Sequence, residues 1–391
     1  MIAADDTAPA AAGALPDGLS VMPRAHAEAR DPEALAKLVR GLGPGPFVAV
    51  ILFISPQADR AVLASGLSSA FPGVPVIGCT TAGEISPEGY SEGEIVAVAL
   101  PRASFAVDCL GVDLGALDQQ ELIGRLIRAR AGLARRHPDW EDEFAFVLVD
   151  GLSIREDELT AALGPGLGPV PLFGGSAGDG TRFAETFVLQ DGQFRQGWAV
   201  LMLVRTACKV KVFSLNHLTP TNRRMVVTGA DPARRVVHQI NAEPAAQEYA
   251  RLLGKDPAQL TTFTFAAHPV VVRIGGSHHV RAIQQMAPNG DLVFFSAIDE
   301  GLVLTLAEPQ DMAEHLDGAL RQLSAEGRPA AILACDCILR RIEAMENQRF
   351  GAVSSLLKSH GVVGFSTYGE QLNSMHVNQT MTGVAIYPPK A

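Results

Sequence analysis

One short phrase occurs three times in this chain, and it constrains the fold more than any other feature. It reads VPVIGCTTAGEIS at residues 74–86, VPLFGGSAGDG at 170–180 and GVVGFSTYGEQ at 361–371. Each copy contains an apolar run, a Gly, a Ser or Thr, another Gly and then a carboxylate. Such self-similarity indicates that the chain repeats one structural unit.

The sequence around each copy follows a common order. Apolar runs typical of strands precede the copies, at 47–55, 145–153 and 330–339. Further apolar runs follow the copies, at 94–101, 197–204 and 382–388. Helical patterns separate run and copy, for example at 57–71 and 340–360. Because continuous apolar strands are typical of sheets covered on both faces, we predict an α/β fold with mixed sheets built from repeated strand-helix-strand units.

The length of 391 residues allows roughly two or three domains. The repeat is weaker over residues 205–330, where a helix is expected from about Pro244 and a meander of short strands follows. We therefore predict an N-terminal α/β domain at 31–230 and a C-terminal α/β domain at 231–391. Residues 1–30, rich in Ala, Pro and Asp at their start, are expected to form a flexible tail.

Composition excludes several classes of function. Hydrophobic residues make up 47% and charged residues 19%, as in folded globular proteins. The net charge of −10, without a block of basic residues, argues against nucleic acid as a partner. No apolar run is long enough to cross a bilayer, and the N-terminus does not read as a signal peptide. Together with five Cys and no export signal, this predicts a cytoplasmic protein without a membrane partner.

The repeated phrase supports two interpretations. Gly permits tight turns at strand ends, and the hydroxyl and carboxylate groups can bond exposed backbone groups, so the copies can be purely structural. Alternatively, the copies line a ligand crevice at the strand ends of an α/β sheet. Both interpretations stay open at this stage.

The second copy also matches a catalytic motif. Residues 174–178 read G-x-S-x-G, the hydrolase nucleophile elbow, with Ser176 as the nucleophile. That motif needs an apolar helix directly after it, whereas the residues that follow read as a loop and a strand-like stretch. A serine hydrolase is therefore the enzymatic alternative, and we expect a protein without catalytic activity.

Several motifs, in order, resemble the FIST sensory domains, bacterial modules that bind small ligands in signal transduction. They are VIGCTTAGEI, FGGSAGD, HQINAEPAAQEY, CDCILRR and the closing GFSTYGEQ…MHVNQTMTGVAIY. The resemblance runs from about residue 45 to residue 388. It implies that the two predicted domains are the FIST N-terminal and FIST C-terminal regions, and that the protein is a sensor.

One branch of this family, the NosP-like nitric oxide sensors, binds haem through a His. The resemblance therefore implies a non-covalent haem b. As a strand, RRVVHQIN places Arg234, Val236, His238 and Ile240 on one face. That face offers His238 as the iron ligand, apolar packing for the ring and a guanidinium for a propionate. Other residues expected at this site are Arg235, Phe263, Phe265 and His268, the last as a rival ligand.

Two sensory hypotheses follow. In the first, the protein binds nitric oxide at a His238-ligated haem and regulates a signalling partner, which the resemblance implies is a histidine kinase or a cyclic-di-GMP enzyme. In the second, the FIST module binds an amino acid or other small molecule without haem. The residues expected to bind that ligand are Thr80, Glu84, Ser176, Asp179, Ser366, Glu370 and His376. A homodimer formed through a sheet edge or domain face is compatible with either.

The cysteines do not suggest a metal site. Cys335 and Cys337 are spaced i, i+2, unlike the C-x-x-C of redox and zinc sites. We predict that both are buried small hydrophobes.

Overall fold

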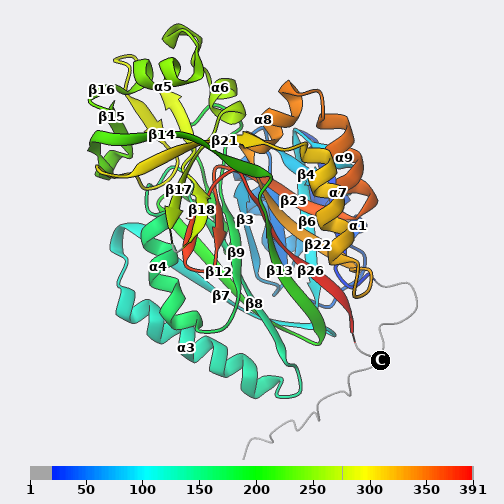
Figure 1. The fold of residues 1–391 in the computed structure, drawn as a ribbon. Coiled ribbons are helices and arrows are strands. Elements are labelled where there is room, and N and C mark those ends of the chain that lie inside the picture. The colour runs from blue at the N-terminus through cyan, green and yellow to red at the C-terminus, as the bar shows by residue number, and fades with distance from the viewer. Residues whose placement is uncertain (1–19, 275, 390–391) are drawn as a thin grey trace, which may run out of the picture.

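The computed structural model describes residues 20–274 and 276–389. These residues form three six-stranded mixed sheets and one eight-stranded antiparallel sheet, with helices on their outer faces (Figure 1). The predicted α/β class with mixed sheets is therefore confirmed. Within the described residues, no helix combines the length and the apolar composition needed to cross a membrane.

Three units with a common order of elements build most of the chain. The first contains β1 (Arg24–Glu28), α1 (Ala34–Leu42), β2 (Phe47–Ile54), α2 (Arg60–Ala70), β3 (Val76–Thr80), β4 (Glu84–Ser86), β5 (Gly89–Ser91) and β6 (Glu94–Pro101). The second contains β7 (Phe105–Asp113), α3 (Gln119–Arg136), β8 (Asp142–Val149), α4 (Glu156–Leu167), β9 (Leu172–Ser176), β10 (Val188–Gln190), β11 (Gln193–Arg195) and β12 (Trp198–Thr206). The third contains β13 (Cys208–Leu215), α7 (Met312–Leu323), β22 (Ala331–Cys337), α8 (Ile338–Glu346), α9 (Phe350–Ser359), β23 (Val362–Thr367), β24 (Glu370–Leu372), β25 (Met375–Val377) and β26 (Met381–Pro389).

The third unit is interrupted between β13 and α7 by residues 218–309, which we call the insertion. It contains β14 (Leu218–Asp231), β15 (Val236–Ile240), β16 (Glu243–Pro244), α5 (Ala245–Leu253), α6 (Thr262–Ala267), β17 (Val270–Ile274), β18 (Ser277–Val280), β19 (Ile283–Met286), β20 (Leu292–Phe294) and β21 (Val303–Pro309). The insertion forms the eight-stranded sheet and lies at one end of the molecule (Figure 1). We call the three units together the body.

Each unit contributes a short β-hairpin that pairs with the sheet of another unit. The β4–β5 hairpin of the first unit pairs with β23 of the third, and the β10–β11 hairpin of the second pairs with β3 of the first. The β24–β25 hairpin of the third unit pairs with β9 of the second. This cyclic exchange interlocks the units, since every sheet of the body contains strands from two of them.

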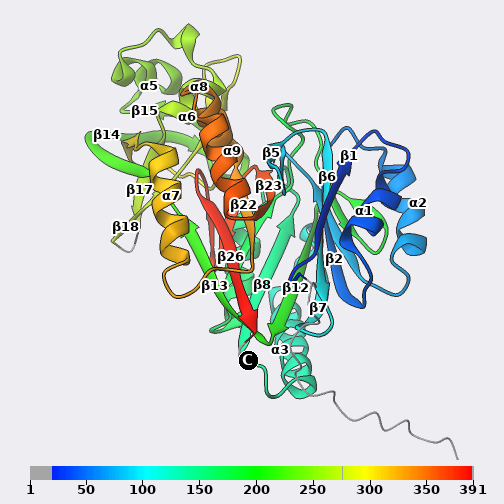
Figure 2. The ribbon, with the colours of Figure 1, turned by 90° about the vertical axis from the view of Figure 1, so that its right-hand side faces the viewer.

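Alternate residues of the central strands face two different cores. On β2, Ala49, Ile51 and Phe53 face an apolar core shared by the three body sheets, whereas Val50 and Leu52 face the helices of their own unit. Strand β8 alternates in the same way. Figure 2 shows α1 and α7 on the outside of the body. Burial on both faces explains why these strands read as continuous apolar runs.

The first Gly of each copy lies inside a strand, not at the turn that we expected. At Gly78, Gly174 and Gly364 an added Cβ would lie 2.3, 2.1 and 1.8 Å from a carbonyl oxygen of the neighbouring parallel strand. No side chain fits at that distance. The repeated Gly therefore reflects a close approach of two strands, which local sequence does not reveal.

The segment expected to be a flexible tail contains strand β1. Residues 24–28 pair with β6, and Ala25 and Ala27 are buried against the first unit. Residues 1–19 lie outside the described residues. The predicted boundary at 230/231 falls within the insertion, and the predicted domain ranges stay predictions.

Candidate ligand site

The three copies of the repeated phrase meet in the body and are joined by backbone hydrogen bonds. Each pair of copies shares an amide-to-carbonyl bond, from Gly178 to Thr80 at 3.0 Å, from Ser366 to Gly83 at 2.8 Å and from Ser176 to Gly369 at 2.8 Å. The copies therefore form the junction at which the three units are held together.

Two of the repeated carboxylates, Glu84 and Glu370, accept hydrogen bonds from residues of their own unit. Glu84 accepts from a Thr hydroxyl three residues earlier and, at 3.1 Å, from the Glu94 amide. Glu370 repeats both contacts, with the Thr367 hydroxyl at 2.6 Å and the Thr380 amide at 3.1 Å. Burial raises the pKa of Glu84 to about 7 and that of Glu370 to about 8. All four carboxylate oxygens already have partners within the protein.

The Asp179 carboxylate also accepts hydrogen bonds from other residues of the protein. It accepts from three successive backbone amides, those of Phe183 at 2.8 Å and of Ala184 and Glu185 at 3.1 Å. The Tyr368 hydroxyl of the third copy donates to the same carboxylate. Asp179 thus shapes the loop after β9 and ties it to the third unit.

The three repeated hydroxyls differ in their partners. Thr80 Oγ1 accepts from the Phe187 amide at 3.0 Å, and Ser176 Oγ accepts from Gln371 Nε2 at 3.0 Å. Ser366 Oγ is buried and has no hydrogen-bond partner in the described part of the chain. Two of the residues expected to bind a small molecule, Ser176 and His376, contact the Gln371 amide.

A set of buried polar side chains lies on the β24–β25 hairpin and on the residues directly after it. We call Gln371, His376, Asn378 and Gln379 the hairpin polar cluster. Gln371 Nε2 lies 3.2 Å from His376 Nδ1. Because an amide nitrogen donates, Nδ1 accepts, and the neutral imidazole carries its proton on Nε2. Gly369 packs directly on this cluster, since a Cβ there would lie within 2.8 Å of both His376 and Asn378.

Much of this cluster is buried without partners. The atoms that have no hydrogen-bond partner among the described residues are Gln371 Oε1, His376 Nε2, Asn378 Oδ1, Asn378 Nδ2 and Gln379 Oε1. Each such buried group costs about 1–3 kcal/mol. Gln379 also has a φ of 49°, which is uncommon for a residue other than Gly. Unpaired polar groups and a strained backbone in one short segment are typical of a functional site.

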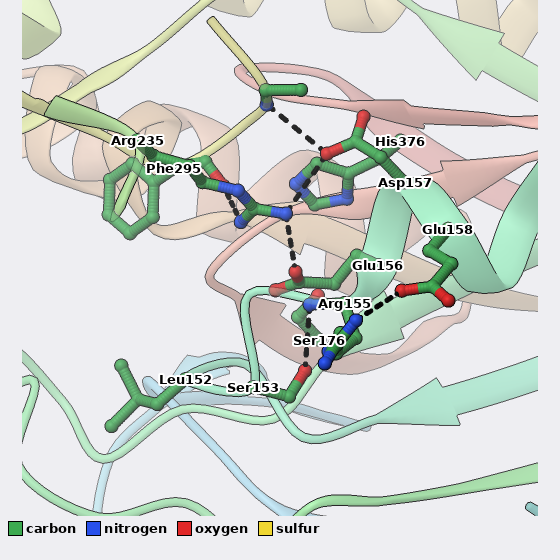
Figure 3. A network of polar contacts seen from close by, with 12 residues as sticks. Leu152, Ser153, Arg155, Glu156, Asp157, Glu158, Ser176, Arg235, Phe295 and His376 are labelled. Carbon is green, nitrogen blue, oxygen red and sulfur yellow. Dashed lines mark hydrogen bonds and ion pairs between the residues drawn. The ribbon is translucent and has the colours of Figure 1, made fainter. Parts of the chain in front are cut away.

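Residues from the N-terminus of α4 and from the insertion lie next to the hairpin polar cluster (Figure 3). Arg235 Nη2 lies 2.8 Å from Glu156 Oε2 and 2.9 Å from Asp157 Oδ2, and the Ala297 amide donates to Asp157 at 3.1 Å. In Figure 3 the His376 imidazole lies beside Asp157. Burial raises the pKa of Glu156 to about 7, against the opposing effect of Arg235. This contact joins the insertion to the second unit.

Arg281 of the insertion acts on the same imidazole. Burial lowers the pKa of His376 to about 4; Asp157 opposes this change, and Arg235 and Arg281 add to it. The Phe295 carbonyl also faces the ring, but no described group meets hydrogen-bond geometry with Nε2. Arg281 Nε likewise has no partner within the described ranges. The positive charge of Arg281 thus acts on an imidazole whose Nε2–H is unpaired and which belongs to the same cluster as the unpaired amide oxygens.

Models of protein families match most of this interlocked chain. The FIST N domain matches residues 48–243, and the FIST C domain matches residues 245–373. The chain belongs to the FIST family. Its two domains are therefore FIST N and FIST C, and its role is sensory, in signal transduction, with a small molecule as ligand. No protein of curated function matches the chain.

The two adjacent arginines expected at a haem in this FIST protein have different environments. Arg234 is exposed at the end of a short 3₁₀ turn, whereas Arg235 is buried in its ion pairs with α4. His238 lies on β15 with its side chain 45% exposed, and its Nδ1 is 2.9 Å from Asp291 Oδ2. The imidazole therefore already has a carboxylate partner at the surface.

The predicted strand face is wrong at His238. The pairing of β15 with β14 shifts register there, between Val237 and Gln239. As a result Val236 and Ile240 are buried, whereas His238 is exposed. A β-bulge breaks the period of two on which the prediction relied.

The remaining residues of the haem set are equally dispersed. Phe265 is buried in the core of the insertion, Phe263 is 47% exposed, and His268 is half-buried at the end of α6. This dispersal does not fit the enclosed apolar pocket that a haem at His238 requires. The described residues also hold no group of three or more His, Cys, Asp or Glu placed to bind a metal ion.

Ser176 makes no hydrogen bond to a general base among the described residues. It is buried at the end of β9, its Oγ pairs with Gln371, and a loop rather than a helix follows it. A nucleophilic Ser needs a hydrogen bond to a base, and the described residues provide none. Cys335 and Cys337 are fully buried on β22, as predicted.

Sequence reasoning missed Gln371, Asn378, Asp157 and Arg281. The only local signal is the polar segment QLNSMHVNQT at 371–380. Such a segment is typical of an exposed loop, because polar residues are mostly found at the surface. Its burial depends on β9 and on the insertion, which are distant in the sequence.

Proposed function

We propose that this FIST protein senses a free amino acid or a similar small zwitterion, bound between the hairpin polar cluster and the insertion. The supporting observations are the buried polar atoms that have no partner among the described residues and the charge of Arg281, which acts on His376 of that group. The Arg281 guanidinium and the His376 Nε2–H suit a carboxylate. The side-chain oxygens of Gln371, Asn378 and Gln379 are acceptors suited to an ammonium group.

The location of this site suggests how binding is transmitted. One wall belongs to a hairpin held by β9, and the other belongs to the insertion, which Arg235 holds to α4. A ligand that contacts both walls favours the arrangement in which they are close, by the difference in its affinity for the two arrangements. In this proposal the protein acts in the cytoplasm, and a histidine kinase or cyclic-di-GMP enzyme detects the change.

Thermal unfolding in the presence of each common amino acid tests the proposal. At least one is expected to raise the melting temperature in a saturable way. Asn378→Ala removes an amide that makes no hydrogen bond in the structure, so binding should weaken at least about tenfold while the unliganded protein loses little stability. Asn373→Asp is the matched control, because Asn373 is exposed on the same hairpin and Asp keeps the oxygen that accepts from the Leu172 amide at 3.2 Å.

Failure of every amino acid to stabilise the protein, or an equal loss in both variants, would contradict the proposal. The haem hypothesis predicts a different result. After expression with a haem precursor, a Soret band that moves on addition of nitric oxide and disappears in His238→Ala would support it. We expect a colourless protein.

A further inference from the structure

A second polar site lies where the insertion joins the body. The chain enters the insertion through residues 216–217 and leaves it through residues 310–311. The two crossings are joined by a hydrogen bond from the Gln310 amide to the His217 carbonyl at 2.8 Å. Helix α8 faces this point and also packs against α6 of the insertion. This site is separate from the hairpin polar cluster and uses none of its residues.

Beside the two crossings lies a buried hydrogen-bond network of charged and polar side chains. Arg340 Nε lies 2.7 Å from Asp336 Oδ1, and Arg340 Nη1 lies 2.8 Å from His217 Nδ1. His217 Nε2 lies 3.0 Å from both carboxylate oxygens of Glu343. The Tyr90 hydroxyl donates to Asp336 at the other end. His217, Arg340 and Glu343 are each at most 2% exposed.

The donors in this hydrogen-bond network determine where the proton of His217 lies. Arginine can only donate, so His217 Nδ1 accepts and its proton is on Nε2, from which it donates to Glu343. Burial also lowers the pKa of His217, which favours the neutral imidazole. Glu343 is therefore a buried carboxylate whose one side-chain partner among residues 20–274 and 276–389 is a neutral N–H. A carboxylate can accept about four hydrogen bonds, so most of its capacity is unused.

Glu343 also lines a cavity. The cavity has a volume of about 330 Å³, within the range of small-molecule sites, and the polar residues around it are Gln310, Asp311, Glu343, Asn347 and Arg349. Arg349 Nη2 lies 2.6 Å from Asp311 Oδ2, so these two rim charges neutralise each other. The charge left over is that of Glu343.

We propose that this cavity binds a small organic cation, a primary ammonium or guanidinium compound, with Glu343 as its carboxylate partner. A buried anion gains most from a cation that replaces its lost hydration. The bound cation would lie against the return crossing of the insertion, at Gln310 and Asp311. Binding would therefore reinforce the hydrogen bond between the two crossings.

The probes for this test are putrescine, agmatine and methylammonium, titrated by calorimetry at constant ionic strength to exclude general screening. At least one is expected to bind saturably. In Glu343→Gln the amide oxygen still accepts from His217 while the charge is lost, so affinity should fall at least about tenfold. Glu346→Gln is the matched control, because Glu346 is exposed on the same helix and does not line the cavity. It should change affinity less than twofold.

A second variant keeps the test decisive if Glu343→Gln unfolds. Asn347→Lys places an ammonium at the exposed rim and should block the probes without disturbing the core. Hydrogen exchange of residues 216–218 and 309–312 should slow with the probe in the wild-type protein. No saturable binding by the wild-type protein, or an equal loss in Glu346→Gln, overturns the proposal. Asn378→Ala, which tests the amino-acid site, should leave cation binding unchanged.

Discussion

Glu370 and His238 show how much the role of one residue depends on the partners that the folded chain gives it. Glu370 is a repeated carboxylate that sequence analysis assigns to a ligand, yet its oxygens are occupied by Thr367 and Thr380. His238 reads as a residue of an apolar face, yet a β-bulge leaves it exposed. In both cases residue type and spacing allow the predicted chemistry, and the actual partners decide whether the group is available.

The buried carboxylate of Glu370 should make stability depend on pH. Its pKa is about 8 in the folded protein and ordinarily 4.5, so the folded state holds an extra proton between these values. The free energy of unfolding should therefore fall as pH rises through this range. Glu370→Gln removes this proton, so its stability should fall less between about pH 5 and 8.

Urea unfolding at four pH values in that window measures the difference. Glu84 and Glu156 also have raised pKa values, so the dependence should decrease without vanishing. Glu346→Gln, at an exposed carboxylate, should leave it unchanged. Parallel curves for the wild-type protein and Glu370→Gln would show that Glu370 is not protonated in the folded state.

The pairing of strands accounts for the repeated phrase at the scale of elements. Each unit needs a Gly where β3, β9 or β23 approaches its parallel neighbour, and a hydroxyl and a carboxylate where the next turn begins. The phrase is thus written three times because the same close approach occurs in three sheets. Its structural role does not by itself create a ligand site.

Gly364→Ala should therefore destabilise the protein strongly. The new Cβ would lie 1.8 Å from the Ala334 carbonyl oxygen, at a φ of 154°. Overpacking and backbone strain each cost about 1–3 kcal/mol, so we expect a loss of roughly 2–6 kcal/mol. Gly318→Ala is the control: nothing lies within 4 Å of a Cβ there, and Ala should stabilise helix α7 by about 0.5–1 kcal/mol. Chemical denaturation measures both, and equal effects would contradict the argument.

The whole molecule is held together by the cyclic exchange of hairpins. The FIST C match, residues 245–373, contains β22 but neither β26, its antiparallel neighbour, nor β9, the partner of β24. The matched regions describe sequence similarity, and the exchange makes the three units of the body one cooperative structure.

A fragment of residues 245–373 should consequently not fold alone. Its circular dichroism and amide proton dispersion are expected to be those of a largely unfolded or aggregated chain, because β22 and β24 lack partners and present unpaired strand edges. Co-expression of residues 20–206 with residues 208–389 supplies every hairpin and should restore a folded complex. A well-folded 245–373 fragment would show that the exchange is dispensable.

The sequence by itself determined the three units, the α/β class, the buried central strands and the membership of a sensory family. These features depend on periodicity and on residue types within one element, which are visible along the chain. Only the tertiary structure decided which hairpin joins which sheet, that Glu84 and Glu370 are paired, that His238 is exposed, and that Gln371, His376 and Asn378 are buried with unused hydrogen bonds. Gln371 contacts Ser176, 195 positions away, and the hairpins pair with strands of other units. Even the partners of Glu84 and Glu370, three and ten positions away, are brought together only by the folded turns, and residue type along the chain does not carry that information.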